Sequence, residues 1–314
     1  MKILITGGAG FIGSNLSQSH LQKDDEIWVI DNLITGAQKN ISSLLKNKNF
    51  HFIKADLVSY DLEVLPWFDI IYHLASPASP IQYKRYPLET LLVNSIGTYR
   101  LLEFMKKSGS KTSVIASTSE VYGDPTVHPQ VESYWGNVNP VGIRSCYDEG
   151  KRFSEAVAIS FVRKHKLNIR IARIFNTYGP NMEKNDGRVV SNFIIQALEN
   201  KPLTIYGNGQ QTRSFCYVSD LIQGLYSLAT TKNIDGQIIN LGSPNEKKIL
   251  ELAKIIIQLT KTKSKISYQP IDEDDPQRRQ PDISKAKKLL NWKPDVKLED
   301  GLKKTIKYFQ ERFS

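Results

Sequence analysis

Cysteine is scarce and long hydrophobic runs are missing from this 314-residue sequence. The two cysteines, Cys146 and Cys216, lie far apart, and neither has a second cysteine or paired histidine at metal-ligand spacing. We therefore expect two reduced, buried thiols and no metal. No apolar run approaches the roughly 20 residues that a membrane-spanning helix requires, so we expect no membrane partner.

Repeats, low-complexity segments and a signal-peptide pattern are missing as well. No repeat period recurs, which excludes a solenoid. The chain begins MKILITGG, a strand pattern that runs into a glycine turn, where a signal peptide would have a charged leader and a long apolar stretch. We expect a cytoplasmic protein.

Basic residues outnumber acidic ones, 42 to 32, and give a formal net charge of +10. The lysines and arginines are spread along the chain, whereas a nucleic-acid binder typically gathers them in one block or face. We therefore expect no nucleic-acid partner. An anionic small-molecule substrate remains compatible with the excess positive charge.

Short apolar runs alternate with segments of helical periodicity over the first half of the chain. Buried strands with intervening helices are typical of a parallel sheet covered on both faces. The sequence predicts an α/β fold with a Rossmann-type doubly wound parallel sheet. The predicted strands are 2–6, 26–30, 50–56, 69–75, 112–118 and 168–175, and the predicted helices are 11–22, 39–46, 87–108 and 147–165.

After Phe175 the pattern loosens into polar loops with helices near 188–199, 219–229 and 246–258, and polar loops of this kind commonly carry specificity. The segment from about 218 to 241 is predicted to return to the main sheet as one more helix and strand. We thus predict a dinucleotide-binding domain of 1–175 plus about 218–241. A smaller, discontinuous C-terminal substrate-binding lobe would comprise about 176–217 and 242–314.

A glycine pattern follows the first predicted strand directly. Gly7, Gly10 and Gly13 form G-x-x-G-x-x-G at the start of a predicted helix. Such glycines allow a tight turn and close approach of a pyrophosphate to the free N–H groups of the helix. The next strand ends at Asp31, whose carboxylate suits ribose hydroxyls and repels a 2′-phosphate, and Asn32 follows in place of an arginine. The pattern predicts an NAD site.

The third and fourth predicted strands also end in residues that could line the cofactor. Asp56 could reach the adenine, or it could cap a helix, and Leu74 could contact the cofactor or pack in the core. The residues predicted to contact NAD are Gly7, Gly10, Phe11, Ile12, Gly13, Asp31, Asn32, Asp56, Leu57, Leu74, Ser76, Tyr147 and Lys151.

A Tyr-x-x-x-Lys pair marks the predicted reaction site. Tyr147 and Lys151 lie one helical turn apart and therefore share a face. A nearby ammonium and a nicotinamide cation would both lower the tyrosine pKa toward that of a general base. The strand before them ends in Ser117 and Thr118, whose hydroxyls could hold the reacting oxygen. Asn94, in the middle of a predicted helix, could organise a water near the lysine.

Together, TGGAGFIG, Asp31, STSE and YDEGK resemble the extended short-chain dehydrogenase/reductase group of NAD-dependent nucleotide-sugar epimerases, dehydratases and decarboxylases. Within that group, several long segments are similar to the UDP-glucuronate decarboxylases, and the resemblance covers essentially the whole chain. These segments are HLASPASP, ASTSEVYGDP, HPQ, YDEGKR, ARIFNTYGPNM, DGRVVSNF, YGNGQQTRSFCYVSDL and DDPQRRQPDI.

The resemblance implies a decarboxylation with tightly held NAD. Tyr147 would take the proton of the sugar 4-hydroxyl while the C4 hydride goes to NAD. The resulting ketone lies β to the C5 carboxylate, which then leaves as carbon dioxide and leaves an enolate behind. A protonated group then returns a proton to C5, and NADH reduces C4 to give UDP-xylose. Thr118, Ser119 and Glu120 would act on the ring and the carboxylate. Related dehydratases carry Asp-Glu in place of Ser119-Glu120, which argues against dehydration here.

The resemblance also assigns substrate contacts. Arg213 and Arg279 suit a diphosphate because guanidinium pairs with phosphate oxygens in a bidentate manner. Tyr83 and Arg85 would face the sugar carboxylate, although an arginine at any of these positions could be a surface ion pair. The implied substrate-binding residues are Tyr83, Arg85, Asn176, Val190, Asn192, Tyr206, Gln211, Arg213 and Arg279.

Three alternatives and one departure accompany this reading. A 4-epimerase or a 4,6-dehydratase would share the hydride step, and a non-catalytic NAD-binding sensor would be expected to lack Tyr147 or Lys151. The family often has Lys-Thr where this chain has Leu92-Val93.

The resemblance further implies a homodimer through the helices 87–108 and 147–165, although these faces could instead pack on the sheet. A C-terminal helix with Trp292, Leu298, Leu302, Ile306 and Phe309 is expected to serve packing.

Overall fold

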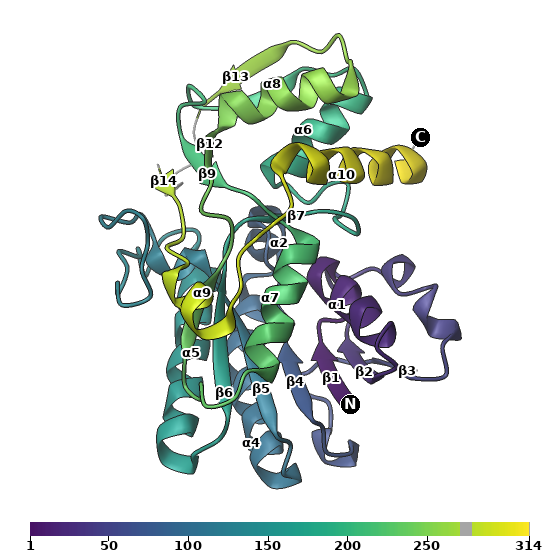
Figure 1. Ribbon diagram of the computed structural model, residues 1–314, viewed down its shortest axis with the longest axis vertical. Helices are drawn as coiled ribbons and strands as arrows, with labels where there is room; N and C mark the ends of the chain where they lie inside the picture. The colour runs from purple at the N-terminus through teal and green to yellow at the C-terminus, as the bar shows by residue number, and fades with distance from the viewer. Residues whose placement is uncertain (271–277, 314) are drawn as a thin grey trace.

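A seven-stranded parallel sheet dominates the computed structural model, which describes residues 1–270 and 278–313 (Figure 1). The strand order is β11-β6-β5-β4-β1-β2-β3. The chain moves outward from β1 to β3 and then returns to the other side of β1, so the order reverses between β1 and β4. Ligands bind at such a switch point in doubly wound sheets. The bounds are β1 (Lys2–Thr6), β2 (Glu26–Asp31), β3 (Phe50–Lys54), β4 (Ile70–His73), β5 (Thr112–Thr118), β6 (Ile169–Ile174) and β11 (Ile238–Leu241).

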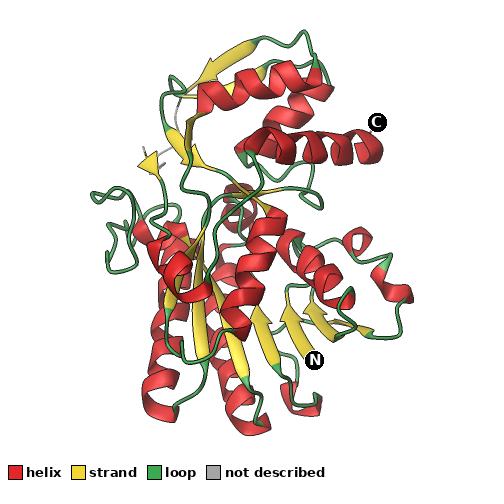
Figure 2. Ribbon diagram, viewed as in Figure 1, coloured by secondary structure: helices red, strands yellow, loops and turns green. Residues whose placement is uncertain are grey.

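Helices cover both faces of this sheet (Figure 2). Alternation along β1 places Ile3 and Ile5 in one core, whereas Leu4 lies in the other. The first core includes residues of α1 (Phe11–Leu21) and α7 (Val218–Thr230), and the second includes residues of α4 (Thr98–Ser108) and α5 (Ser145–His165). All six predicted strands are present, and the doubly wound α/β fold is confirmed.

Two predicted helices differ from the structure. The segment 39–46 forms two 3₁₀ turns, η1 (Gln38–Asn40) and η2 (Leu44–Lys46), because serine and asparagine compete with helical hydrogen bonding. Ser42 donates to the Lys39 carbonyl in this segment. The predicted helix 87–108 is interrupted, since a π-turn, η4 (Val93–Gly97), separates α3 (Pro87–Leu92) from α4. Asn94 lies in this π-turn.

A second group of elements lies beyond the carboxyl ends of the strands, at the top of Figure 1. The segment 218–241 supplies α7 and the edge strand β11, which pairs with β6. The division into two lobes stays a prediction. The group contains α6 (Val189–Leu198), β8 (Leu203–Tyr206), β9 (Thr212–Ser214), β12 (Glu246–Lys248), α8 (Ile249–Thr260), β13 (Ile266–Gln269), β14 (Arg278–Arg279) and α10 (Leu298–Phe313).

One further predicted helix differs from the structure at its start. The predicted helix 246–258 begins three residues late, because Glu246–Lys248 pairs with β9 as strand β12. No helix among residues 1–270 and 278–313 is long and apolar enough to cross a membrane. The remaining elements are η3 (Leu62–Val64), α2 (Pro80–Arg85), η5 (Ser119–Tyr122), β7 (Thr177–Tyr178), β10 (Cys216–Tyr217) and α9 (Ser284–Leu290).

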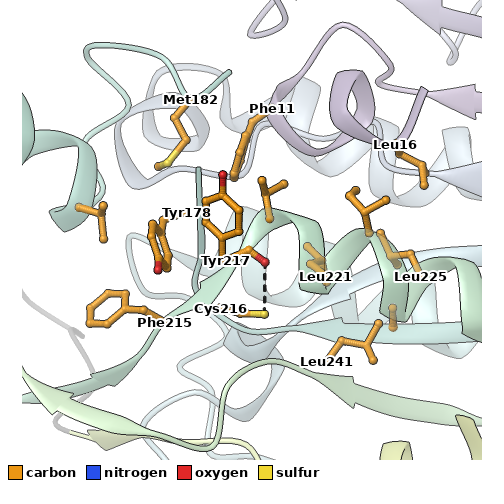
Figure 3. Close-up of a cluster of buried hydrophobic side chains, with 14 of the residues drawn as sticks. Phe11, Leu16, Tyr178, Met182, Phe215, Cys216, Tyr217, Leu221, Leu225 and Leu241 are labelled. Carbon is orange, nitrogen blue, oxygen red and sulfur yellow. Dashed lines mark hydrogen bonds between the residues drawn. The ribbon is translucent and has the colours of Figure 1, made fainter. Parts of the chain in front are cut away.

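One face of the sheet carries a cluster that joins α1, α7 and the 178–182 and 215–217 segments (Figure 3). Cys216 is buried there as a free thiol, and Cys146 is buried and free as well, as predicted. Trp292 lies between α9 and α10, so placing it in the C-terminal helix was wrong. Its indole N–H donates to the Asp220 carbonyl at 2.9 Å, which fixes the indole against α7.

Candidate active site

A cavity of about 660 Å³ opens over the carboxyl ends of β1 to β6. Its walls come from the loops after these strands, the start of α5, and residues of α6, β8, β9 and β14. All of the predicted cofactor, catalytic and substrate residues line it except Arg85. The cavity therefore joins residues that are more than 270 positions apart in the sequence, such as Gly7 and Arg279.

The glycine loop forms the floor of the cavity beside α1. Gly7 has a φ of +76°, and a Cβ there would lie 2.7 Å from the Ala75 nitrogen. A Cβ on Gly13 would lie 2.2 Å from the Gly7 carbonyl oxygen. Only glycine fits both positions, because one needs a left-handed backbone and the other a close approach of helix to loop. The first-turn N–H groups of α1 thus face a cradle free of side chains.

Asp31 ends β2 within this cradle. It accepts hydrogen bonds from Ala9 N at 2.9 Å and Leu33 N at 2.8 Å, one on each carboxylate oxygen. Burial raises the pKa of Asp31, and these two bonds oppose that rise. Each oxygen keeps a lone pair, so the carboxylate can still accept from a ribose hydroxyl.

Asp56 serves the turn after β3 while lining the cavity. Its Oδ1 accepts from Val58 N at 2.8 Å, and its Oδ2 accepts from the Asn32 amide at 3.1 Å. No helix begins at Asp56, so it does not cap one, and the expected contact with the adenine stays a prediction. Leu57 and Leu74 line the same wall, so Leu74 is not sealed in the core.

Tyr147 and Lys151 lie side by side on α5. The Lys151 ammonium nitrogen is 5.9 Å from the Tyr147 ring centre and donates to the Ala116 carbonyl at 2.7 Å. Burial lowers the pKa of Lys151 to about 7, while Glu155 acts in the opposite direction. Burial also raises the pKa of Tyr147 to about 12, and a hydrogen bond with Thr118 offsets only part of this. The lowering of the tyrosine pKa that was predicted requires a bound nicotinamide cation as well as the Lys151 ammonium, and it stays a prediction.

Glu120 lies at the reaction end of the cavity between arginines. It accepts from Arg279 at 2.6 Å and from Arg144. Burial acts to raise its pKa, but Arg279, Arg144 and Arg213 together lower the pKa of Glu120 to about 2. The same Glu120 charge, added to burial, raises the pKa of Asp148 to about 7. Glu120 is thus an ionised carboxylate at neutral pH and cannot donate a proton there.

Arg279 is buried, and its guanidinium is bound by the protein. It donates to Ser119 Oγ at 3.1 Å and to the Gly123 carbonyl at 2.9 Å, in addition to Glu120. A buried cation needs such partners. The structure therefore places Arg279 beside the catalytic candidates, and its expected contact with the diphosphate stays a prediction. Of the DDPQRRQPDI segment, residues 274–277 lie outside the described part of the chain.

Ser117 is bound differently from what was expected, whereas the water expected at Asn94 stays a prediction. Ser117 Oγ donates to Glu155 at 2.5 Å, so Thr118 is the hydroxyl that meets Tyr147. The Asn94 amide donates to Ser76 Oγ at 2.9 Å, and its main-chain oxygen accepts from Ser154 and Thr98. Asn94 therefore braces the Ser76 wall of the cavity through the π-turn.

The predicted substrate residues divide into two groups. Tyr83 is buried and stacks on Tyr147, with ring centres 5.1 Å apart and planes 5° from parallel. Arg85 is exposed, lies over the Tyr86 ring at 5.3 Å, and is not brought to the cavity. The others that line it with Tyr83 are Asn176, Val190, Asn192, Tyr206, Gln211, Arg213 and Arg279.

Sequence reasoning missed Arg144 and Arg188, both of which line the cavity. Arg144 precedes α5 by one residue and lies three positions before Tyr147, a spacing that indicates proximity in a helix but not the partner. Arg188 precedes α6, ion-pairs with Asp186 and lies over the Phe11 ring at 5.7 Å. No group of three or more His, Cys, Asp or Glu side chains suited to a metal occurs in the described ranges.

The comparison with known proteins shows one consistent family. Residues 4–305 match the model described as GDP-mannose 4,6 dehydratase. UDP-glucuronic acid decarboxylase 1 of Danio rerio is 52% identical over 98% of this chain and 72% of its own length. UDP-glucuronic acid decarboxylase 4 of Arabidopsis thaliana is 49% identical over 99% of this chain and 69% of its own length. The chain belongs to the family of this model, in its UDP-glucuronic acid decarboxylase branch.

A solved structure shares the fold of this family member throughout. The UDP-glucuronic acid 4-epimerase of Bacillus cereus, in complex with UDP-glucuronic acid and NAD, superposes with a TM-score of 0.91. It is 32% identical and covers 100% of both chains. The decarboxylase branch thus shares its architecture with enzymes that bind NAD and a UDP-sugar.

Proposed function

We propose that the protein decarboxylates UDP-glucuronate to UDP-xylose, using tightly held NAD. The observation that carries the proposal is the arrangement of Tyr147, bonded to Thr118, beside an ionised Glu120 that is flanked by Arg144 and Arg279. Decarboxylases of this specificity are about 50% identical to almost the whole chain, which supports the same assignment.

The residues at the glycine loop fit NAD. Gly7 and Gly13 let the loop, the neighbouring strand end and the helix pack closely without a Cβ, and the first turn of α1 would hold the pyrophosphate beside this loop. Asp31 would accept from the adenosine ribose and would repel a 2′-phosphate, which favours NAD over NADP. Bound there, NAD supplies the hydride acceptor and donor for C4, and its cationic ring favours a phenolate.

Tyr147 is the base for the 4-hydroxyl in this proposal. Its hydroxyl meets Thr118, which would share the bond to the reacting oxygen. Lys151 is buried next to it and keeps the local potential positive when protonated. Positive charge from both Lys151 and the nicotinamide ring is required here, because burial leaves Tyr147 with a pKa of about 12 even though the Thr118 bond opposes this rise.

Loss of carbon dioxide follows from the state of Glu120. Oxidation at C4 makes the substrate a β-keto acid, in which the electrons of the breaking bond enter an enolate, and this enolate takes up a proton at C5 before C4 is reduced. Arg144 and Arg279 are already paired with Glu120, so neither is fully available to neutralise and retain the substrate carboxylate. A carboxylate placed beside this anionic group gains by leaving as neutral carbon dioxide.

Ser119 separates the alternatives. A 4,6-dehydratase needs an acid at the C6 hydroxyl, and related dehydratases have an Asp where this chain has Ser119, whose hydroxyl is a poor acid. The 4-epimerase remains the second candidate, because the Bacillus cereus enzyme shares the fold over the full length. An epimerase must keep the carboxylate that a decarboxylase releases.

We also propose a homodimer formed through α3, η4, α4 and α5. Large apolar side chains on these elements are exposed, including Leu88 at 68%, Tyr99 at 52% and Phe153 at 51%. They lie outside the two sheet-facing cores, so packing on the sheet does not use them. Apolar residues gathered on paired helices are typical of a four-helix interface.

The purified protein with UDP-glucuronate, first alone and then with added NAD, tests the proposal. We expect one carbon dioxide and one UDP-xylose for each UDP-glucuronate consumed. UDP-galacturonate without carbon dioxide would establish the epimerase and refute the decarboxylase.

A further inference from the structure

Gln130 is a fully buried polar residue in the loop between η5 and α5, and the reaction proposed above does not use it. It belongs to the HPQ segment. Its amide oxygen accepts from Gln280 N at 2.8 Å, and its amide nitrogen donates to the Val127 carbonyl at 2.9 Å. Both functions of the side chain are therefore committed to backbone groups.

The backbone of Gln130 completes a short pairing with the chain just after β14. Gln130 N donates to the Gln280 carbonyl at 2.9 Å, and the Gln130 carbonyl accepts from Asp282 N at 2.8 Å. A parallel bridge joins Gln130 to Pro281. Asn240, buried in β11, donates to the carbonyls of Gln130 and Asp282 at 3.0 and 3.1 Å. One glutamine and one asparagine thus fix residues 280–282 to the sheet.

Arg279 immediately precedes this fixed segment. Its guanidinium reaches Glu120 and Ser119 of η5 and the Gly123 carbonyl just after it. Strand β14 itself consists of only two residues paired to β9, which is a weak constraint on direction. The Arg279 carbonyl also accepts from Ser214 Oγ at 3.1 Å, and the Gln280 side-chain amide donates to the Pro244 carbonyl at 2.6 Å, so the bonds of Gln130 act together with these to position the guanidinium.

We propose that Gln130 is a positioning residue that holds Arg279 against Glu120 for catalysis. Its side-chain oxygen captures the amide next to Arg279, and its backbone captures the following two residues. Gln130 thereby fixes the position of the Arg279 guanidinium, whose positive charge keeps Glu120 ionised although the two residues are distant in sequence. This inference rests on the proposed function of Glu120 and Arg279.

The test uses Gln130→Met, which keeps the length of the side chain but removes both its donor and its acceptor. A misplacement of about 1 Å in a catalytic group costs on the order of 10²-fold in rate. We expect kcat and kcat/KM for UDP-glucuronate to fall together by about that factor, because the lost contact acts on the reacting groups. NAD content should stay at the wild-type level.

Gln196→Met is the matched control. Gln196 accepts from Thr204 N at 3.0 Å and donates to Thr204 Oγ1 at 3.2 Å, so this variant also loses one bond of each kind to a neighbouring strand. It does not line the cavity. We expect a comparable loss of stability with wild-type kcat. If Gln130→Met does not fold, Gln130→Asn replaces it, since the shorter amide cannot bridge Val127 and Gln280.

Hydrogen exchange of peptides covering 278–284 supplies a readout that needs no activity. We expect faster exchange of the Gln280 amide in the Gln130 variant and wild-type exchange in the Gln196 variant. Unchanged exchange, or faster exchange with kcat within about twofold of wild type, would overturn the inference. A wild-type protein that releases no carbon dioxide would instead refute the proposed function, while the exchange result would still show whether Gln130 holds the segment.

Discussion

Replacing Lys151 by methionine is expected to stabilise the fold near neutral pH while removing most of the turnover. The ammonium is buried and has one hydrogen bond, to the Ala116 carbonyl at 2.7 Å. Burial lowers the pKa of Lys151 from 10.5 to about 7. At about 1.4 kcal/mol for each factor of ten in proton affinity, this corresponds to roughly 5 kcal/mol of lost stability below pH 7.

Methionine has no charge to desolvate, and it gives up one hydrogen bond worth about 1 kcal/mol. The variant should therefore gain up to about 4 kcal/mol in the free energy of unfolding below pH 7. This effect on the free energy of unfolding is opposite to that of a lysine in a salt bridge, where the charged side chain stabilises the fold. Between about pH 7 and 10.5 the unfolded chain holds the proton that native Lys151 has released, so wild-type stability rises with pH. The advantage of the variant should shrink across the same window.

Urea unfolding of the two proteins at matched NAD content, at about pH 6 and about pH 9, measures this difference. Turnover should fall by at least about 10²-fold, as is usual when a group supporting proton transfer is lost. A variant that is less stable than wild type at about pH 6, or whose advantage does not change with pH, would refute the buried-ammonium argument.

Three further variants test the other assignments. Tyr147→Phe should lose nearly all turnover and retain NAD, measured by carbon dioxide release and by the cofactor freed on denaturation; normal turnover would remove Tyr147 as the base. Arg279→Met should raise the Glu120 pKa from about 2, so that activity is lost at a higher pH as the solution is acidified; an unchanged acid limb in the rate profile would contradict this role. Phe153→Asp should convert the proposed dimer to monomer in sedimentation, and an unaltered sedimentation coefficient would place the interface elsewhere.

The sheet could be predicted because its strands are short apolar runs in which no helical periodicity competes with the strand pattern. The runs at 2–6 and 112–118 match β1 and β5 residue for residue. Glycines at 7 and 13 similarly identify a loop that no other residue fits, since added Cβ atoms would meet backbone. The segment 39–46 was predicted wrongly, because its helical pattern says nothing of how strongly serine and asparagine bond locally.

The chemistry of the site was only partly predictable. Tyr147 and Lys151 share a helix face, so their spacing was sufficient. Arg279 reaches Glu120 across 159 positions of sequence, and Gln130 and Asn240, which bind the chain that follows Arg279, are distant from it in sequence as well. The pKa values of Tyr147 and Lys151 depend on how deeply α5 is buried, a quantity that spacing does not contain.

The central claim is that C4 is oxidised and then reduced on the same molecule while the carboxylate leaves. UDP-glucuronate carrying deuterium at C4 tests it most directly, with the product analysed by mass and by NMR. The account predicts UDP-xylose that retains the deuterium at C4, together with one carbon dioxide for each turnover. UDP-xylose without the deuterium, or a product that retains the carboxylate, would contradict it.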